Sequence, residues 1–342
     1  MLDRYEVGRE LGHGTYGIVY SGIDRANGMA VALKKLKRVP KGFDHGVNFT
    51  SIREIALLQE LDCEYIIKIL DFVTKGSSDI YIVQELMESD LSEIIYNRDI
   101  EINQSIIKAY MKMILTALAY CHNNFILHLD IKPANFLLAP DNSLKLTDFG
   151  FARFFGKSGE QFTPQLCTIA YRSPELLFGA TRYTGAADIW SVGCIFGELM
   201  MRGPLFPGNP DHDTEQDHLS QIFYVRGSPD VNIWEGVTEL PSYIEFAQSS
   251  PKPLQDIFPK APQDALDLLD MLLQLDPNKR ISASEALEHK YFSSLPQAAQ
   301  LTDLPSYRMG KAQQKLNQLN SQPTRKLVAP IPQIEKINIF DY

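Results

Sequence analysis

Two short polar segments contain the residues of this chain that are best suited to chemistry. His128–Asn135 includes Asp130, Lys132 and Asn135, and thirteen residues after the asparagine comes Asp148, the first residue of an Asp-Phe-Gly triplet. Two carboxylates, an amide and an ammonium in this order meet the needs of phosphoryl transfer: a group that orients a hydroxyl, oxygen ligands for magnesium, and a cation on the moving phosphate. Asp and Asn also commonly cap loop turns, but further motifs follow in the matching order. We therefore predict a phosphoryl-transfer site.

A glycine-rich segment near the N-terminus matches a phosphate-binding pattern. Glycines in this pattern let backbone amides close over phosphates without side-chain obstruction. By itself the pattern is equally typical of a plain hairpin turn. The following strand carries Val31-Ala32-Leu33-Lys34, which favours the phosphate-binding interpretation. The family resemblance described below implies that Lys34 holds the α- and β-phosphates. The glycine-rich residues are Gly12, His13, Gly14, Thr15, Tyr16, Gly17, Ile18 and Val19.

Apolar periodicity predicts the elements that must position these residues. Tyr5–Val39 has a β-like pattern with glycine-rich turns, which predicts antiparallel hairpins. Thr50–Leu61 has one apolar stripe and predicts a helix, and Ile80–Leu86 predicts a short strand. After about Asp90 helical spacing dominates, so a β-rich first lobe is expected to meet a helical second lobe. The helices predicted there are Ser105–His122, Ala187–Met201, which stops at Arg202-Gly203-Pro204, Gln216–Tyr224, Gln263–Leu275 and Ser282–Leu287.

Length and composition set the outer limits of the interpretation. With 342 residues, 44% of them hydrophobic, the chain is long enough for two lobes. We expect an N-lobe over about 1–86, a C-lobe over about 87–292, and a tail over 293–342 that is either flexible or docked on the surface. The core is expected to end around Phe292.

Charge and cysteine spacing exclude several classes of function. The formal net charge of −9 gives no basic field of the kind that binds nucleic acid. The four cysteines are far apart and form no C-x-x-C pair, which argues against a zinc site or a disulfide scaffold. The N-terminal residues lack an apolar signal core, and no apolar run approaches the roughly 18 residues of a membrane span. We expect a soluble intracellular protein of the nucleus or cytoplasm.

The motifs together resemble those of protein kinases, and one segment narrows the resemblance. Val47–Glu54 is similar to the cyclin-binding helix of cyclin-dependent kinases. The resemblance to that family runs from about Tyr5 to Phe292. Within it, the segments Leu176–Ala180, Leu240–Tyr243 and Pro253–Phe258 are most similar to the CDK-activating, transcription-associated branch. This resemblance implies a bilobal α+β kinase fold with a β-rich N-lobe containing one main helix and a mostly helical C-lobe. It also implies ATP and Mg²⁺ as cofactors and a cyclin as activating partner.

The resemblance also assigns catalytic and metal-binding roles. Asp130 is expected to align the substrate hydroxyl and accept its proton late, and Lys132 to neutralise the γ-phosphate. Glu54 is expected to pair with Lys34, although a helix glutamate is more often simply solvated. Asn135 and Asp148 are the expected Mg²⁺ ligands. The expected nucleotide site comprises Leu11, the glycine-rich residues Gly12 to Val19, Ala32, Lys34, Glu85, Met87, Asp90 and Leu137.

Leu129 is the main departure from the family pattern. Most protein kinases have Arg here, and in cyclin-dependent kinases this Arg joins two others in binding the phosphorylated activation loop. Arg53 and Arg153 match the other two, and Thr163 occupies the phosphoacceptor position. A phosphate with about two negative charges would meet one guanidinium fewer. We hypothesise that activation depends less on phosphorylation of Thr163 than in relatives. A compatible alternative is that Leu129 simply packs beneath the loop.

Several other family positions carry expectations. Glu175 is expected to pair with Arg280 and anchor the second lobe, and Arg172 to shape a pocket for the proline after the phosphorylated residue. Asp188 is expected to accept hydrogen bonds from the catalytic-loop backbone. Gln84 falls behind the adenine position, where a buried hydrogen bond is an equal alternative to a gating role.

Two further positions raise a regulatory question. Thr15 and Tyr16 match an inhibitory phosphorylation pair of cell-cycle kinases, a departure from the CDK-activating branch. They are as easily interpreted as ordinary loop residues. Ala170 replaces the usual bulky aromatic before Tyr171, which leaves the shape of the substrate groove open.

The sequence therefore predicts a cyclin-dependent protein kinase that phosphorylates Ser or Thr followed by Pro in protein substrates. Candidate substrates implied by the resemblance are the RNA polymerase II C-terminal repeats and the activation loops of other cyclin-dependent kinases. Two alternatives stay open: a cell-cycle or mitogen-activated-type kinase, and an inactive scaffold that binds nucleotide or a cyclin. Retention of Lys34, Glu54, Asp130, Asn135 and Asp148 argues against the scaffold.

Overall fold

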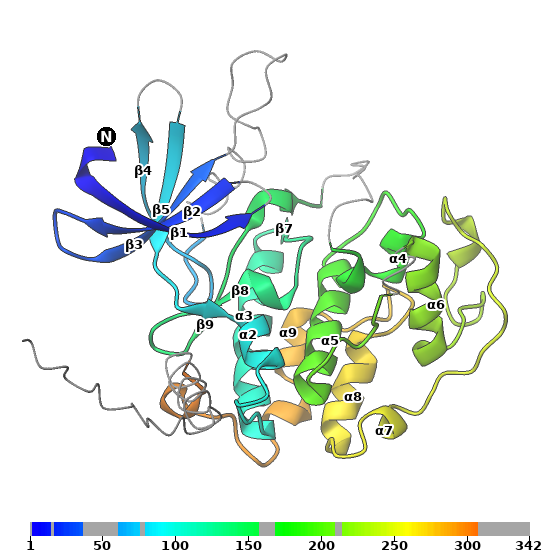
Figure 1. Cartoon of the computed structure of the whole chain (residues 1–342). Coiled ribbons are helices and arrows are strands. Elements are labelled where there is room, and N and C mark those ends of the chain that lie inside the picture. The colour runs from blue at the N-terminus through cyan, green and yellow to red at the C-terminus, as the bar shows by residue number, and fades with distance from the viewer. Residues whose placement is uncertain are drawn as a thin grey trace, which may run out of the picture.

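The computed structural model describes residues 2–14, 17–36, 61–75, 79–156, 168–208 and 214–306. In this part of the chain a β-sheet N-lobe is followed by a mainly helical C-lobe, and the two meet just after strand β5 (Asp79–Glu85) (Figure 1). The predicted bilobal α+β fold is therefore confirmed. The predicted N-lobe helix, Thr50–Leu61, lies almost wholly outside the described residues.

Five antiparallel strands form the N-lobe sheet in the order β1-β2-β3-β5-β4. Val31 and Leu33 of β3 pack with Val83 of β5 in a small apolar core on this sheet. A Cβ atom at Gly17 would overlap the carbonyl oxygen of Lys35, so strand contact alone requires the third glycine of the glycine-rich segment. The remaining strands are β1 (Tyr5–Gly14), β2 (Gly17–Asp24), β3 (Ala30–Leu36) and β4 (Ile69–Lys75).

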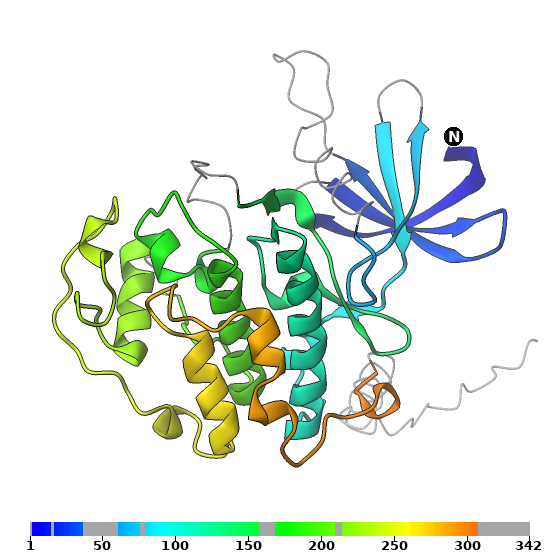
Figure 2. The same ribbon diagram turned by 180° about the vertical axis from the view of Figure 1, so that it is seen from behind.

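The C-lobe is built around two long helices, α3 (Gln104–Asn123) and α5 (Ala186–Met201), which lie side by side with α8 and α9 in both views (Figures 1 and 2). Each extends its predicted range by no more than one residue at either end. Arg202 takes a positive φ at the end of α5, where the sequence predicted a stop. Within the described ranges, no helix has the length and apolarity to cross a membrane. The other α-helices are α2 (Leu91–Tyr96), α4 (Pro174–Leu177), α6 (Glu215–Arg226), α7 (Leu254–Ile257), α8 (Gln263–Leu272) and α9 (Ala283–Leu287).

Helix α8 is shorter than predicted, because it ends at Leu272 and not at Leu275. Pro277 disfavours a helical conformation at Asp276, which sets the furthest position that the helix could reach but not its end at Leu272. The side chains of Arg226 and Arg280 donate to the carbonyl oxygens of the three residues after the helix end. These side chains satisfy carbonyl oxygens at the C-terminus of the helix, which have no donor within the helix.

Short elements carry the polar segments between the lobes. Strands β6 (Ser89–Asp90), β8 (Phe136–Leu138) and β9 (Leu144–Leu146) form a small sheet, and β7 (Ile126–Leu127) pairs with β10 (Arg153–Phe154). The two predicted catalytic segments adjoin these strands. The 3₁₀ turns are η1 (Leu2–Arg4), η2 (Pro133–Asn135), η3 (Phe149–Phe151), η4 (Ile169–Tyr171), η5 (Val237–Glu239), η6 (Lys290–Phe292) and η7 (Leu301–Asp303).

The chain continues to pack against the C-lobe after Phe292. The backbone N–H of Ala299 donates to the carbonyl oxygen of Ser105 at 2.9 Å. Leu304 is buried and belongs to the main core cluster. The core therefore extends past Phe292, where the sequence analysis ended it, and the remaining tail from residue 307 lies outside the described residues.

Candidate active site

Asp130 lies at the centre of the candidate active site, on the loop between β7 and β8. It is buried, and its Oδ2 accepts hydrogen bonds from Lys132 Nζ at 2.8 Å and from Asn135 Nδ2 at 2.9 Å. Burial by itself raises the pKa of Asp130, but the hydrogen bond and charge of Lys132 outweigh it and lower the pKa below its ordinary value. The carboxylate is therefore ionised at neutral pH and accepts hydrogen bonds.

The backbone of the catalytic loop is held by Asp188 at the start of α5. Asp188 accepts from the N–H of His128 at 2.9 Å and from the N–H of Leu129 at 2.8 Å, which confirms the predicted structural role. His122 on α3 contacts the same carboxylate at 3.0 Å. These contacts stabilise a positive φ of 64° at Leu129, a conformation that residues with a Cβ rarely adopt.

Thr168 is a residue of this site that the sequence analysis missed. Its Oγ1 accepts from Lys132 Nζ at 3.0 Å and lies 3.2 Å from Asp130 Oδ1. Its backbone N–H also donates to Asp130 Oδ1 at 3.3 Å. The signal was its place three residues before Tyr171, the first residue of the Tyr-Arg-Ser-Pro-Glu motif.

Lys34 and Asp148 meet across the lobes. Lys34 Nζ on β3 lies 3.3 Å from Asp148 Oδ1, and Asp148 precedes η3 with a φ of 66°. Phe149 is fully buried, and its ring packs edge-on against His128 at 4.8 Å between centroids. The Phe149 ring thus fixes the Asp-Phe-Gly triplet to the catalytic loop, while the Asp148 carboxylate faces Lys34 of the N-lobe.

The donor atoms at Asn135 and Asp148 suit a nucleotide-bound Mg²⁺. Asn135 uses its Nδ2 to donate to Asp130, which leaves the amide oxygen as the atom available to a metal. Among the described residues, no group of three or more His, Cys, Asp or Glu side chains can hold a metal ion. Mg²⁺ in nucleotide sites is bound by one or two protein oxygens together with phosphates. The two oxygen donors therefore fit a metal that arrives with ATP.

The predicted nucleotide-site residues come from both lobes. Leu11 and Gly12 are on β1, Ala32 is buried on β3, and Leu137 is on β8. Gly17, Ile18 and Val19 are buried or half-buried on β2. The described part of the chain gives only the backbone of His13 and Gly14, and Thr15 and Tyr16 lie outside it.

The side chains at the lobe junction have partners within the protein. Glu85 accepts from the N–H of Lys68 at 3.1 Å and pairs with Lys145 Nζ at 3.3 Å. Asp90 Oδ1 caps α2 by accepting from the N–H of Ser92 at 2.9 Å. These contacts leave the backbone near Glu85 as the part suited to the edge of an adenine ring. Met87 packs half-buried against the C-lobe core beside it.

Gln84 is buried next to this junction. Its Nε2 has no hydrogen-bond partner among the described residues. A buried amide without a partner is costly, which makes Gln84 a point where a bound ligand group would be stabilising.

Leu129 packs as the alternative interpretation predicted. It is 3% exposed and belongs to an apolar cluster with Leu176 and Tyr183, against which Phe151 and Phe155 pack. An arginine at this position would place a charge in that cluster.

The other regulatory positions are described only in part. Arg153 donates to the carbonyl oxygens of Phe151 and Ala152 at 3.0 and 2.9 Å. Arg53, Glu54 and Thr163, which the sequence analysis also assigned to catalysis or regulation, lie outside the described residues.

Two ion pairs hold the Tyr171–Glu175 motif in place. Arg280 forms a two-pronged pair with Glu175 at 2.8 and 3.1 Å, and both side chains are buried, which confirms this prediction. Arg172 is buried and pairs with Glu215 at 2.5 Å. The guanidinium predicted to shape the substrate pocket is thus tied to the start of α6.

A buried carboxyl group lies behind this segment. Glu198 on α5 accepts from the hydroxyl of Tyr171 at 3.0 Å. Burial raises the pKa of Glu198 to about 7, and the hydrogen bonds from Tyr171 and Tyr96 only partly oppose this rise. Between its ordinary value near 4.5 and about 7, the folded protein therefore binds a proton that the unfolded chain does not.

This difference predicts a pH effect on stability. The stabilisation from protonated Glu198 is lost as pH rises from about 5 to about 7, and it amounts to up to about 3 kcal/mol. Glu198→Gln removes the ionisation but keeps a partner for Tyr171, so the variant should gain stability relative to the parent as pH rises. Urea unfolding at pH 5, 6, 7 and 8 measures the difference. A difference that stays constant across this series would contradict the assignment.

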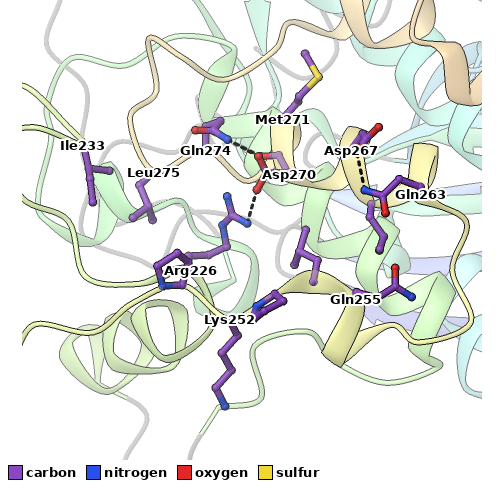
Figure 3. A pocket seen from close by; sticks show the side chains of 14 residues that line it. Arg226, Ile233, Lys252, Gln255, Gln263, Asp267, Asp270, Met271, Gln274 and Leu275 are labelled. Carbon is purple, nitrogen blue, oxygen red and sulfur yellow. Dashed lines mark hydrogen bonds and ion pairs between the residues drawn. The ribbon is translucent and has the colours of Figure 1, made fainter.

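The cavity in Figure 3 is separate from this site. It has a volume of about 730 Å³ and lies on the C-lobe, lined by residues of α6, α7 and α8. Arg226 pairs there with Asp270 at 2.8 Å, and Gln274 bonds the same carboxylate (Figure 3). None of the predicted catalytic or nucleotide-site residues lines it.

Comparison with known proteins shows where similar sequences and structures occur. The protein kinase domain family matches residues 5–292. Cyclin-dependent kinase 7 of Dictyostelium discoideum is 43% identical over 306 residues, which cover 89% of this chain and 84% of that protein. Cyclin-dependent kinase D-1 of Arabidopsis thaliana is 44% identical over 306 residues, covering 89% of this chain and 75% of that protein. The solved structure of the CAK complex of Chaetomium thermophilum bound to ATP-γ-S contains a chain that matches with a TM-score of 0.82 and 38% identity, covering 88% of this chain and 95% of that one.

Proposed function

Because the chain belongs to the protein kinase family and, within it, to the cyclin-dependent kinases, we propose that it transfers the γ-phosphate of ATP to Ser or Thr followed by Pro. The observation that supports this most strongly is Asp130, ionised and held by Lys132, Asn135 and Thr168. Lys34 of the N-lobe and Asp148 of the C-lobe lie together and provide the charged groups that a nucleotide needs.

Each residue has one task in the proposed reaction. Asp130 orients the substrate hydroxyl and accepts its proton late, so a strongly raised pKa is unnecessary. Lys132 neutralises the transferred phosphoryl group. Thr168 hydrogen-bonds to both Lys132 and Asp130 and so holds these two side chains in position. Lys34 holds the α- and β-phosphates, and Glu54 is proposed to orient its ammonium.

Asn135 and Asp148 would hold Mg²⁺, which neutralises phosphate charge when it is bound with ATP. The nucleotide site proposed from the sequence also includes the glycine-rich loop and the backbone after Glu85. The similar CAK complex structure is bound to ATP-γ-S, which supports a nucleotide as a ligand of this chain.

A cyclin is the proposed activating partner. The relatives are named as cyclin-dependent kinases, and the similar solved chain belongs to a complex. We further propose the RNA polymerase II C-terminal repeats and the activation loops of other cyclin-dependent kinases as candidate substrates. Arg172, tied to Glu215, is proposed to shape the site for the proline that follows the phosphorylated residue.

The test is a phosphotransfer assay with the full chain, a co-purified cyclin and Mg·ATP. Two peptides that differ only in Ser-Pro against Ser-Ala provide the specificity arm, and a Lys34→Met variant provides the inactive control. We expect transfer to the Ser-Pro peptide only. Absence of any ATP consumption in the presence of the cyclin would favour an inactive scaffold instead.

The apolar surroundings of Leu129 predict weak dependence on Thr163. Because the third arginine is missing and its place is packed with apolar side chains, a phosphate on Thr163 has less to bind. Thr163→Ala with its cyclin should therefore retain activity within about tenfold of the parent. Peptide phosphorylation rates measure this, with Thr238→Ala, at an exposed threonine of the C-lobe, as a matched control. A loss as severe as in relatives with three arginines would contradict the hypothesis.

A further inference from the structure

Residues Ser293–Ser306, which we call the C-terminal strap, are held by a buried lysine. Lys108 on α3 is 0% exposed. Its Nζ donates to the carbonyl oxygen and the hydroxyl of Ser294 at 2.8 and 2.9 Å, and to the carbonyl oxygen of Pro296 at 2.9 Å. It also lies 4.7 Å from the centre of the Tyr291 ring. A buried ammonium is stable only when its three donors have partners, and the strap provides all three acceptors.

The other end of the strap reaches the turn between β8 and β9. Asn142 Nδ2 in this turn donates to the carbonyl oxygen of Leu301 at 3.1 Å. Asn142 has a φ of 69°, a left-handed conformation that asparagine adopts more readily than most residues with a Cβ. Leu304, just beyond, is buried in the main core. The strap is therefore held at its start by Lys108 and near its end by burial of Leu304. Leu301, between these two points, contacts the turn.

The β8–β9 hairpin connects this turn to the proposed metal ligands. Asn135 immediately precedes β8, and Asp148 comes two residues after β9. The sheet to which the hairpin belongs has strands of only two or three residues. Sheets this small are marginal on their own, so their geometry depends on what packs against them.

We propose that the C-terminal strap positions the proposed metal ligands by fixing the β8–β9 turn, with Asn142 as the positioning residue. This inference rests on the proposed function for the identity of the ligands, but the coupling between strap and hairpin does not. The strap is thus a working part of the kinase domain, although it lies beyond residue 292, where the family match ends.

The first test compares two substitutions at Asn142 in the full chain. Asn142→Asp places a carboxylate oxygen against the Leu301 carbonyl, whereas Asn142→Gly loses the hydrogen bond but tolerates the positive φ. Hydrogen exchange is measured without nucleotide or metal. We expect amides of residues 136–146 to exchange about 5- to 10-fold faster in Asn142→Asp, and less so in Asn142→Gly. Unchanged exchange in both variants would overturn the proposal.

A second test separates positioning from general loss of stability. The rise in Tm on adding ATP is recorded as a function of Mg²⁺ concentration. Because this rise reports binding and not turnover, the measurement does not require the chain to be catalytically active. In Asn142→Asp the Mg²⁺ needed for half of this rise should increase about 3- to 10-fold. A lower Tm with the same Mg²⁺ dependence would assign Asn142 a purely structural role and overturn the proposal.

A matched pair of lysine variants tests transmission along the strap. Lys108→Met removes the donors to Ser294 and Pro296, whereas Lys112→Met changes an exposed lysine one turn along the same helix. We expect faster exchange at residues 136–146 in Lys108→Met only. Failure of the phosphotransfer assay in the parent chain would count against the proposed function. The exchange results would still decide whether the strap fixes the β8–β9 turn.

Discussion

Replacing Asp130 by Asn is expected to lower kcat by about 10³-fold while the KM for ATP stays nearly constant. The substitution keeps the shape of the side chain and its hydrogen bonding to Thr168, but removes the charge that Lys132 neutralises and the oxygen that accepts the substrate proton. Because the lost interaction is made with the hydroxyl of the protein substrate, the effect belongs in the chemical step. Steady-state kinetics with the Ser-Pro peptide and the cyclin measure it.

The matched control for this prediction is Asp99→Asn, which changes an exposed acid of the same lobe by the same atoms. It should leave kcat unchanged. Circular dichroism and Tm for both variants would show whether the catalytic loop still folds. An Asp130→Asn enzyme with kcat within about tenfold of the parent would remove Asp130 from the role of base.

Arg280→Met is expected to destabilise the C-lobe by about 3 to 5 kcal/mol. Removing the guanidinium leaves the buried carboxylate of Glu175 without its partner. It also leaves the carbonyl oxygens of Ala186 and Gln274 without the donors that Arg280 supplies. Urea unfolding followed by tryptophan fluorescence measures the loss, since Trp190 lies beneath the guanidinium at 5.2 Å.

Substitution of the other member of this ion pair should destabilise the C-lobe less than Arg280→Met does. Glu175→Gln should cost less, about 1 to 3 kcal/mol, because Arg280 keeps its carbonyl acceptors. The double variant should cost less than the sum of the two single changes, since the unpaired carboxylate is then absent. Equal costs for the two single variants would mean that the carbonyl contacts of Arg280 add nothing measurable.

The sequence predicted best where local periodicity and local burial agree. Helices α3 and α5 each present long apolar stripes to one core, so their ranges were nearly right. Strand β4 was missed because its residues alternate poorly between buried and exposed positions. The Glu175–Arg280 pair and the role of Asp188 were predicted through the family resemblance and are confirmed.

What the sequence did not predict depends on partners far apart in the chain. Lys108 sits in a helix whose pattern gives no hint that a lysine should be fully buried, and its acceptors at Ser294 lie 186 residues away. The composition after Phe292, rich in Gln, Asn, Pro and Lys, predicted a tail without revealing that it carries those acceptors. Thr168 lies three residues before the Tyr-Arg-Ser-Pro-Glu motif, but its contact with Asp130, 38 residues earlier, depends on the fold.

The junction around Glu85 has a consequence for how the two lobes can move. Beside the covalent connection after β5, the segment before β4 is bonded to the C-lobe hairpin, because Ile67 N–H donates to the carbonyl of Leu146 and Leu146 N–H to that of Tyr65. Lys145 adds a charged contact to Glu85. Two parallel attachments permit rotation about the line that joins them and resist twisting about any other axis. We expect the two lobes to move toward and away from each other along a single path, so that a bound partner would change which positions on that path are occupied and would not create a new direction of motion.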